Sequence, residues 1–261
     1  MSGPVLPAPT LHRTGEGPPV LLLHPLGVDH SFWDGVLPSL RGLEILTYDF
    51  PGHGQTPVPD RPYTIEDLTE QAAGLLADAG AGPADVVGVS LGGLVAQRLA
   101  ACSPELVRRL VVVDAVAVYP PALREQWRDR AARTPVEGLE PLVDATLALW
   151  FTADRLAGGG PAVEGVRRTF LAGDPRGYAA ACRALEQVDL TGVVDRIAVP
   201  TLVVCGEDDA PPFVAAARDL AGTLPDARLV WLAPARHAGV LEQPEQFAQA
   251  LTGFLRDGQA R

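Results

Sequence analysis

The fold of this chain is indicated most clearly by the stretch Asp85-Val86-Val87-Gly88-Val89-Ser90-Leu91-Gly92-Gly93-Leu94-Val95-Ala96-Gln97. Valines dominate the residues before Ser90, as in a buried strand, and the apolar residues after it recur at helical spacing. Ser90 therefore falls where a strand turns into a helix. Gly88 and Gly92 flank it in a Gly-x-Ser-x-Gly pattern, which lets the two backbones crowd together and holds the serine hydroxyl above the edge of the sheet.

A serine in this position is a candidate nucleophile, and two backbone amides are candidate donors to a developing oxyanion. The helix that follows the serine presents its first N–H groups to the turn, so we predict the Leu91 amide as one donor. The second is expected in the loop His24-Pro25-Leu26-Gly27, which follows an apolar run at residues 20–23. Because proline has no N–H, the prediction falls on Leu26.

A nucleophilic serine on such a strand-to-helix turn is followed along the chain by an acid and then by a base. Of the five histidines, His237 is the one that comes after Ser90, and it follows the last predicted strand. The acid is expected in the loop after a strand at residues 201–205, where we predict Asp209. Its neighbour Asp208, and Asp114 at the end of an earlier strand, stay open as alternatives.

The composition limits the partners of the chain. A formal net charge of −11 repels nucleic acids and anionic membrane surfaces, which leaves a small-molecule substrate as the expected partner. The three cysteines lack metal-ligand spacing, so we predict neither a metal nor another cofactor. The first 17 residues have neither the basic nor the apolar segment of a signal peptide, and we expect a cytoplasmic protein. A homo-oligomer is compatible with this composition.

Strand and helix patterns alternate up to residue 115 and resume after residue 196. Between these positions the strand signal gives way to helical patterns at residues 122–132, 139–151, 163–171 and 178–190. We therefore predict an α/β fold with a mostly parallel, doubly wound sheet, formed by residues 1–115 and 197–261. Residues 116–196 are expected to form a helical cap over the edge of the sheet where catalytic loops gather.

Several of these features together resemble the α/β-hydrolase superfamily, namely the turn around Ser90, the turn at residues 49–54, the loop at residues 206–209 and the late His237. Within that superfamily the chain is most similar to the 3-oxoadipate enol-lactonases. The similarity lies in Leu149-Trp150-Phe151-Thr152, in residues 177–182 and in the Leu26-Gly27 pair. The chain departs from that family at Ala153, where a proline is frequent, and at His24-Pro25, where an Asn-Ser pair is frequent.

The resemblance implies a cofactor-independent serine hydrolase that cleaves a small carboxylic ester or lactone through an acyl-enzyme. Its expected substrate is 3-oxoadipate enol-lactone, an intermediate of aromatic catabolism, and Ser90, Asp209 and His237 would form its catalytic triad. A broader-specificity carboxylesterase or a cofactor-free haloperoxidase-like hydrolase is the alternative. A binding protein of the same fold without catalysis is a third interpretation.

Aromatic residues in two parts of the chain are predicted to line the substrate pocket. Trp33 lies shortly after the predicted oxyanion loop, and Trp150 and Phe151 lie in the predicted cap. A substrate carboxylate would need a cation, for which the cap offers Arg155 or Arg183.

Overall fold

The computed structural model describes residues 6–257, and it is built on one seven-stranded sheet in the order β1-β3-β2-β4-β5-β6-β7. All neighbours run parallel except the first pair, β1 (His12–Thr14) and β3 (Glu44–Thr47). The parallel strands are β2 (Pro19–Leu23), β4 (Ala84–Val89), β5 (Val107–Val113), β6 (Thr201–Gly206) and β7 (Ala227–Leu232). The predicted mostly parallel, doubly wound sheet is confirmed.

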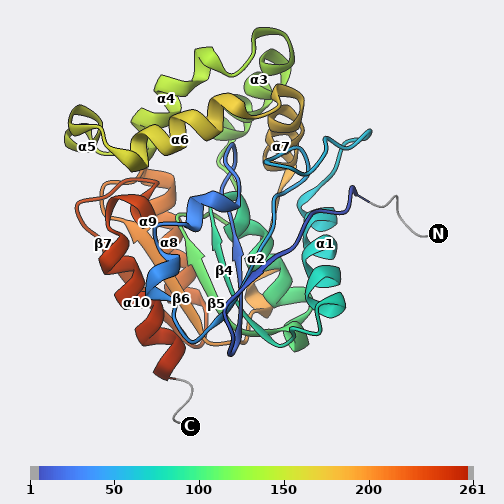
Figure 1. The fold of residues 1–261 in the computed structure, drawn as a ribbon, viewed down its shortest axis with the longest axis vertical. Coiled ribbons are helices and arrows are strands. Elements are labelled where there is room, and N and C mark those ends of the chain that lie inside the picture. Colours follow the sequence, from blue (N-terminus) through green and yellow to red (C-terminus); the bar gives the residue numbers. More distant parts are fainter. Residues whose placement is uncertain (1–5, 258–261) are drawn as a thin grey trace.

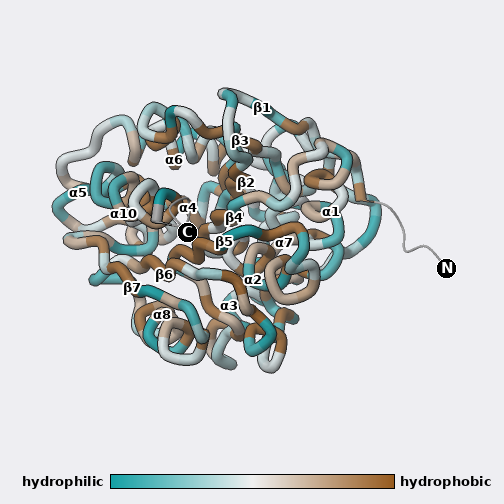
Figure 2. Tube along the Cα trace, turned by 90° about the horizontal axis from the view of Figure 1, so that it is seen from below, coloured by the Kyte–Doolittle hydropathy of each residue, from teal (hydrophilic) through white to brown (hydrophobic). Residues whose placement is uncertain are grey.

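The central strands are continuous apolar runs because helices cover them on both faces. Every residue of β4 and β6 is buried, and the hydrophobic colouring is strongest along these strands. In Figure 2, α2 (Leu91–Cys102) and α8 (Pro211–Thr223) lie on one side of the sheet, and α10 (Pro244–Asp257) lies on the other. The core therefore sits in two layers, above and below the sheet.

The first long helix, α1 (Ile65–Asp78), begins with a reciprocal cap. The Thr64 hydroxyl accepts a hydrogen bond from the Asp67 N–H, and the Asp67 carboxylate accepts one from the Thr64 N–H. This reciprocal capping satisfies two backbone donors that a helix start leaves without partners. The helix packs against α2, the helix that follows Ser90.

Five helices between residues 121 and 187 gather at one end of the molecule, above the sheet (Figure 1). They are α3 (Pro121–Glu137), α4 (Glu140–Trp150), α5 (Ala153–Gly158), α6 (Pro161–Ala172) and α7 (Pro175–Gln187). The segment leaves and rejoins the rest of the chain at one place, because Val118 and Asp189 form an isolated antiparallel bridge. We call residues 119–188 the helical segment.

One contact between the helical segment and the sheet domain is unusually close. A Cβ atom built on Gly177, in the first turn of α7, would lie 2.2 Å from the carbonyl oxygen of Gly52. No side chain fits at that distance, so glycine is required there. The loop that contains Gly52 and the start of α7 therefore meet backbone to backbone.

The predicted boundaries 1–115 and 197–261 include residues 1–5 and 258–261, which lie outside the described part of the chain. Among the described residues, none of the helices combines the length and the apolar character needed to cross a membrane.

Candidate active site

Ser90 occupies a strained turn between β4 and α2. Its backbone has φ +52° and ψ −109°, a conformation that residues other than glycine rarely adopt. Its N–H donates to the carbonyl oxygen of Val113, at 2.9 Å. A Cβ on Gly88 would come within 2.1 Å of the Gly92 carbonyl oxygen, and one on Gly92 within 2.3 Å of the Leu23 carbonyl oxygen. Both flanking glycines are thus needed for the turn to form.

Three side chains from distant parts of the chain meet at this turn. The Nε2 atom of His237 lies 3.0 Å from Ser90 Oγ, and its Nδ1 atom lies 2.8 Å from Asp209 Oδ2. All three residues are buried, with 5–7% of their surface exposed. Asp209 follows β6 and His237 follows β7, so the carboxyl ends of adjacent parallel strands bring the three together.

The hydrogen bonds define the tautomer of His237. An ionised carboxylate only accepts, so Nδ1 carries the proton and donates to Asp209, while Nε2 accepts from the Ser90 hydroxyl. Burial of the ring opposes its protonation, but the charge and hydrogen bond of Asp209 outweigh burial, and the pKa of His237 lies above its ordinary value. The ring can therefore take a proton from Ser90 and hold it.

The other two carboxyl groups considered for this position do not contact His237. Asp208 is exposed on the outside of the loop. Asp114 is buried next to the site, where its Oδ1 atom accepts a hydrogen bond of 2.9 Å from the Gly206 N–H. Burial, together with the nearby charge of Asp209, raises the pKa of Asp114 well above its ordinary value. Both effects favour the protonated form of Asp114, which lies behind the Asp209–His237 pair.

The two predicted oxyanion donors, Leu91 and Leu26, lie at the start of α2 and in the loop after β2. Leu91 is the first residue of α2, so its N–H has no acceptor within the helix. Leu26 lies in the loop after β2, and β2 pairs with β4 through Leu23 and Gly88. The oxyanion role of Leu26 and Leu91 stays a prediction.

His24 holds the loop before Leu26 in place. Its Nδ1 atom donates to the Pro25 carbonyl oxygen at 2.8 Å, and its Nε2 atom accepts from the Phe50 N–H at 3.0 Å. Burial lowers the pKa of His24, so the ring is neutral and can make both bonds. This position departs from the frequent Asn-Ser pair, and the histidine bridges the loop to the segment after β3.

A buried glutamate that the sequence analysis did not single out fixes the loop that contains His237. Glu242 is 4% exposed, and its Oε2 atom accepts from the Arg236 N–H at 2.7 Å. Its Oε1 atom accepts from the N–H and the hydroxyl of Thr152, at 2.9 and 2.6 Å. The carboxylate therefore connects the loop to the helical segment. A glutamate in a short helix gives no sequence signal of such a role.

Aromatic side chains surround the meeting point of Ser90 and His237. The His237 ring lies 4.4 Å from the Phe213 ring and 6.4 Å from the Trp150 ring, measured between centroids. The Tyr119 side chain lies within electrostatic reach of the Ser90 side chain, and burial raises the pKa of this phenol. The phenol is therefore neutral and is a second polar group at the nucleophile.

The Arg130 guanidinium lies near the aromatic wall, the name used here for Phe213, Trp150 and Tyr119. The Tyr119 ring lies 5.6 Å from the Trp127 ring, and the Arg130 guanidinium lies 5.2 Å from the centroid of the same indole. Arg130 also donates to the Tyr178 hydroxyl at 2.9 Å. The sequence analysis did not single out Arg130, because the apolar pattern of its helix α3 is weak and the residue itself carries a charge.

The structure corrects part of the predicted pocket. Trp150 lies near His237, but Trp33 and Phe151 are both 0% exposed and present no surface to a substrate. The Trp33 ring packs against Phe247 of α10, on the far side of the sheet from α2. Both side chains belong to the hydrophobic core.

The two arginines predicted as cations lie elsewhere. Arg155 is exposed on α5 and donates to the Glu242 carbonyl oxygen at 2.9 Å. Arg183 is exposed on α7 and lines a surface cavity of about 650 Å³ beside the loop at residues 57–62. Neither contacts the aromatic wall around Ser90.

One group of possible metal ligands lies beside the site. Ligand atoms of Asp114, Cys205 and Asp209 come within 4.8 Å of one another. Burial raises the pKa of both the Cys205 thiol and Asp114, and Asp209 is hydrogen-bonded to His237, so this group belongs to the site around Ser90.

The fold and the site together define a class, the α/β hydrolases with a serine at the strand-to-helix turn. Residues 20–250 match the model of the alpha/beta hydrolase family, and the chain belongs to that family. It is 29% identical to 3-oxoadipate enol-lactonase 2 of Acinetobacter baylyi, over 92% of this chain and 90% of that one. It is 32% identical to a pimeloyl-[acyl-carrier protein] methyl ester esterase of Chromobacterium violaceum, over 92% and 95% of the two chains.

Solved structures give the same result. The crystal structure of the enol-lactonase from Burkholderia xenovorans superposes with a TM-score of 0.90 at 33% sequence identity, covering 96% of this chain and 98% of that one. The relatives therefore include both lactonases and esterases, and the family is shared while the substrates differ.

Proposed function

We propose that this chain is a serine hydrolase that cleaves a small carboxylic ester or lactone through an acyl-enzyme. The observation that carries the proposal is the continuous series of hydrogen bonds from Ser90 through His237 to Asp209. A neutral imidazole that accepts from a serine hydroxyl and donates to a buried carboxylate can activate that hydroxyl as a nucleophile.

In the first half of the reaction, Ser90 Oγ attacks the substrate carbonyl carbon while His237 Nε2 takes the hydroxyl proton. Asp209 stabilises the imidazolium that forms. The Leu26 and Leu91 amides donate to the oxyanion of the tetrahedral intermediate. When the intermediate collapses, the bond to the leaving oxygen breaks, and His237 returns the proton to that oxygen.

In the second half, water replaces the leaving group. His237 takes a proton from the water, whose oxygen attacks the acyl carbon, and the second collapse releases the carboxylic acid and restores the Ser90 hydroxyl. When the substrate is an enol-lactone, the leaving oxygen is the ring oxygen and stays in the same molecule. The enol that is released becomes a ketone, which draws the reaction forward.

As the substrate we propose 3-oxoadipate enol-lactone. The likeness to enol-lactonases of two organisms supports it. This lactone also carries a carboxylate, and Arg130 stands next to the aromatic wall at Ser90, through Trp127 and Tyr119. A guanidinium held against an indole is partly desolvated, which strengthens its attraction to an anion.

The test compares kcat/KM on 3-oxoadipate enol-lactone with kcat/KM on p-nitrophenyl acetate, with the Ser90→Ala variant as the blank. The proposal expects the enol-lactone to be favoured by several orders of magnitude, and Ser90→Ala to lose activity by about 10⁶-fold. Preference for the activated ester would favour the broader-specificity carboxylesterase or the cofactor-free haloperoxidase-like hydrolase. Unchanged activity in Ser90→Ala would refute the serine mechanism itself.

The carboxylate contact has a separate test. Arg130→Gln should raise KM for the enol-lactone at least tenfold and leave p-nitrophenyl acetate, which is neutral, almost unchanged. Arg128→Gln is the matched control, because it removes the same charge from an exposed side chain of the same helix that pairs with Glu186. Equal effects of both variants on the two substrates would show that Arg130 does not bind the carboxylate.

A further inference from the structure

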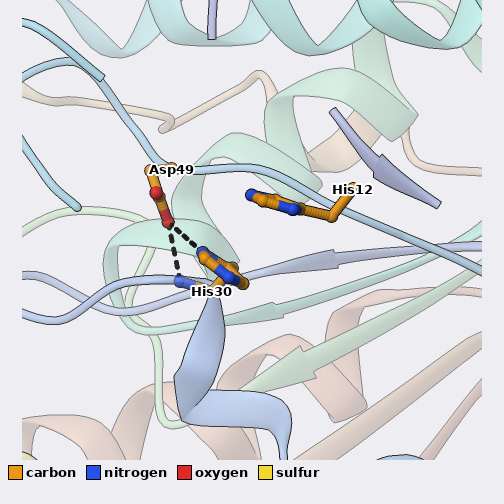
Figure 3. A group of neighbouring side chains, drawn as sticks. All are labelled: His12, His30 and Asp49. Atoms are coloured by element: carbon orange, nitrogen blue, oxygen red, sulfur yellow. Dashed lines mark hydrogen bonds and ion pairs between the residues drawn. The ribbon is translucent and has the colours of Figure 1, made fainter. Parts of the chain in front are cut away.

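A second cluster of titratable side chains involves neither Ser90, Asp209 nor His237. His12 belongs to β1, His30 begins the short 3₁₀ helix His30–Trp33, and Asp49 follows β3. The two imidazole rings are stacked, with centroids 3.9 Å apart and planes 20° from parallel. Figure 3 shows both rings beside the Asp49 carboxylate. Three separate elements thus bring two imidazoles and a carboxylate together.

The carboxylate of this cluster is ionised and well oriented. Its Oδ1 atom accepts from the His30 N–H and from His30 Nδ1, both at 2.8 Å, and its Oδ2 atom accepts from the Gln55 N–H at 3.0 Å. Burial opposes the charge, but the backbone N–H groups of Gln55 and His30 favour it, and the pKa of Asp49 lies below its ordinary value. Asp49 therefore offers a fixed anionic oxygen next to His30.

The second imidazole has a nitrogen that nothing in the described chain satisfies. His12 Nε2 is buried and has no hydrogen-bond partner among residues 6–257. A buried polar nitrogen without a partner is unfavourable and calls for a ligand or another explanation. One ligand atom from each of His12, His30 and Asp49 lies within 4.8 Å of the other two.

From this arrangement we propose that His12, His30 and Asp49 bind one divalent transition-metal ion of the zinc or nickel type. Imidazole nitrogens and a carboxylate oxygen are the ligands that such borderline cations prefer. The ion takes the place of the proton between His30 Nδ1 and Asp49, and that proton leaves to solvent. It also provides the missing partner of His12 Nε2.

Binding one ion requires one of the two imidazole rings to rotate. An ion lies in the plane of each imidazole that binds it, and the stacked planes of His12 and His30 are only 20° from parallel. Metal–ligand bonds of about 2.0–2.2 Å also place neighbouring ligand atoms roughly 3.3 Å apart, against the 2.8 Å that now separates His30 Nδ1 from Asp49. The His30 side chain is 27% exposed, so it is the ring that can rotate out of the stack. A cavity of about 420 Å³ lined by His30 and Asp49 gives access and room for water as a further ligand.

Binding would connect β1, the loop after β2 and the end of β3, and it does not involve Ser90, Asp209 or His237. The proposal is therefore independent of the proposed reaction. It predicts that an ion which binds the folded chain and not the unfolded one stabilises the fold.

The test uses the full chain without an affinity tag, freed of metal with EDTA and titrated with ZnCl₂ and NiCl₂ by calorimetry. We expect one ion per chain with micromolar affinity, and a melting temperature that rises by about 2 °C or more at saturation. His12→Gln and His30→Gln should each weaken binding at least tenfold. Co²⁺ should give visible absorption bands that the His12→Gln variant loses.

Asp34→Asn is the matched control, because it removes an exposed carboxylate close to His30 and should leave the affinity unchanged. The His12→Gln variant keeps the His30–Asp49 hydrogen bond, so its fold can be checked by its melting temperature in EDTA. Absence of binding at millimolar metal would overturn the proposal. So would affinity that is the same in His12→Gln and His30→Gln as in the parent chain, because the ion would then lie elsewhere.

Discussion

The carbonyl oxygen of Trp150 accepts a hydrogen bond of 2.9 Å from the N–H of Ala238, the residue after His237. The last turn of α4 is thereby fastened to the loop that contains the proposed base. Glu242 adds a second connection between the same two segments, through Thr152 and Arg236. The helical segment therefore also positions the loop that carries His237 relative to Ser90.

This connection predicts a loss of both activity and stability in Glu242→Gln. The amide that replaces one carboxylate oxygen turns an N–H₂ group toward a backbone N–H, which leaves a buried donor unpaired and costs ~1–3 kcal/mol. We expect a lower melting temperature and a kcat reduced about tenfold, measured by thermal unfolding and by ester hydrolysis. The control is Glu245→Gln, an exposed glutamate at the start of α10. Equal behaviour of the two variants would contradict the role of Glu242.

The raised pKa of His237 predicts the pH profile. The imidazole must be neutral to accept the Ser90 proton, so kcat/KM should fall as the pH drops through a midpoint above 6.5, the ordinary histidine value. Asp209→Asn removes the charge that raises the pKa and leaves burial, which lowers it. An NMR titration of His237 in that variant should give a midpoint below 6.5. The same midpoint in both proteins would show that Asp209 does not set the pKa.

The two buried carboxyl groups behind His237 should respond very differently to the same substitution. Asp209→Asn should reduce kcat by about 10⁴-fold, because the amide no longer holds the imidazole in the required tautomer. Asp114 accepts from the Gly206 N–H and does not hydrogen-bond to His237, so Asp114→Asn leaves the Asp209–His237 pair in place. Its kcat should stay within about threefold. Steady-state kinetics of both variants on one ester measure the difference. A large loss of kcat in Asp114→Asn would identify Asp114 as the acid of the triad.

The contact between Gly52 and Gly177 predicts opposite effects for two similar substitutions. Gly177→Ala forces a methyl group against a backbone carbonyl oxygen and should destabilise the fold by ~1–3 kcal/mol. Gly165, on α6, has nothing within 4 Å of the position that an added Cβ atom would take, so Gly165→Ala should stabilise its helix by ~0.5–1 kcal/mol. Urea unfolding of both variants measures the difference. A neutral Gly177→Ala would mean that the α7 start can move away from the sheet domain.

Much of the fold could be predicted because its signals are local. The valine run before Ser90 and the helical spacing after it fix β4 and α2, and the Thr64–Asp67 pair marks the start of α1. Chain order and loop position were enough to indicate His237 and Asp209 as neighbours of Ser90. The helix α8 was not predicted, although a pair of prolines opens it at Pro211.

Residues whose role depends on which way a side chain turns were harder to predict. Trp33 and Phe151 looked like pocket residues but are fully buried. Arg130 lies against Trp127 on α3, and the direction of its side chain depends on how α3 packs against the rest of the helical segment. The weak apolar pattern of α3 does not indicate that direction.

Local patterns indicated the parallel strands, the strained serine turn and the chain order of the three residues that meet there, because glycine spacing and hydrophobic runs act over a few residues. The choice of Asp209 over Asp208 as partner of His237 became clear in the folded chain, and so did the link that Glu242 makes to the loop and the meeting of His12 with His30 and Asp49. Each of these depends on contacts between segments far apart in the chain. Such contacts are fixed by the packing of the whole core, which no local pattern contains.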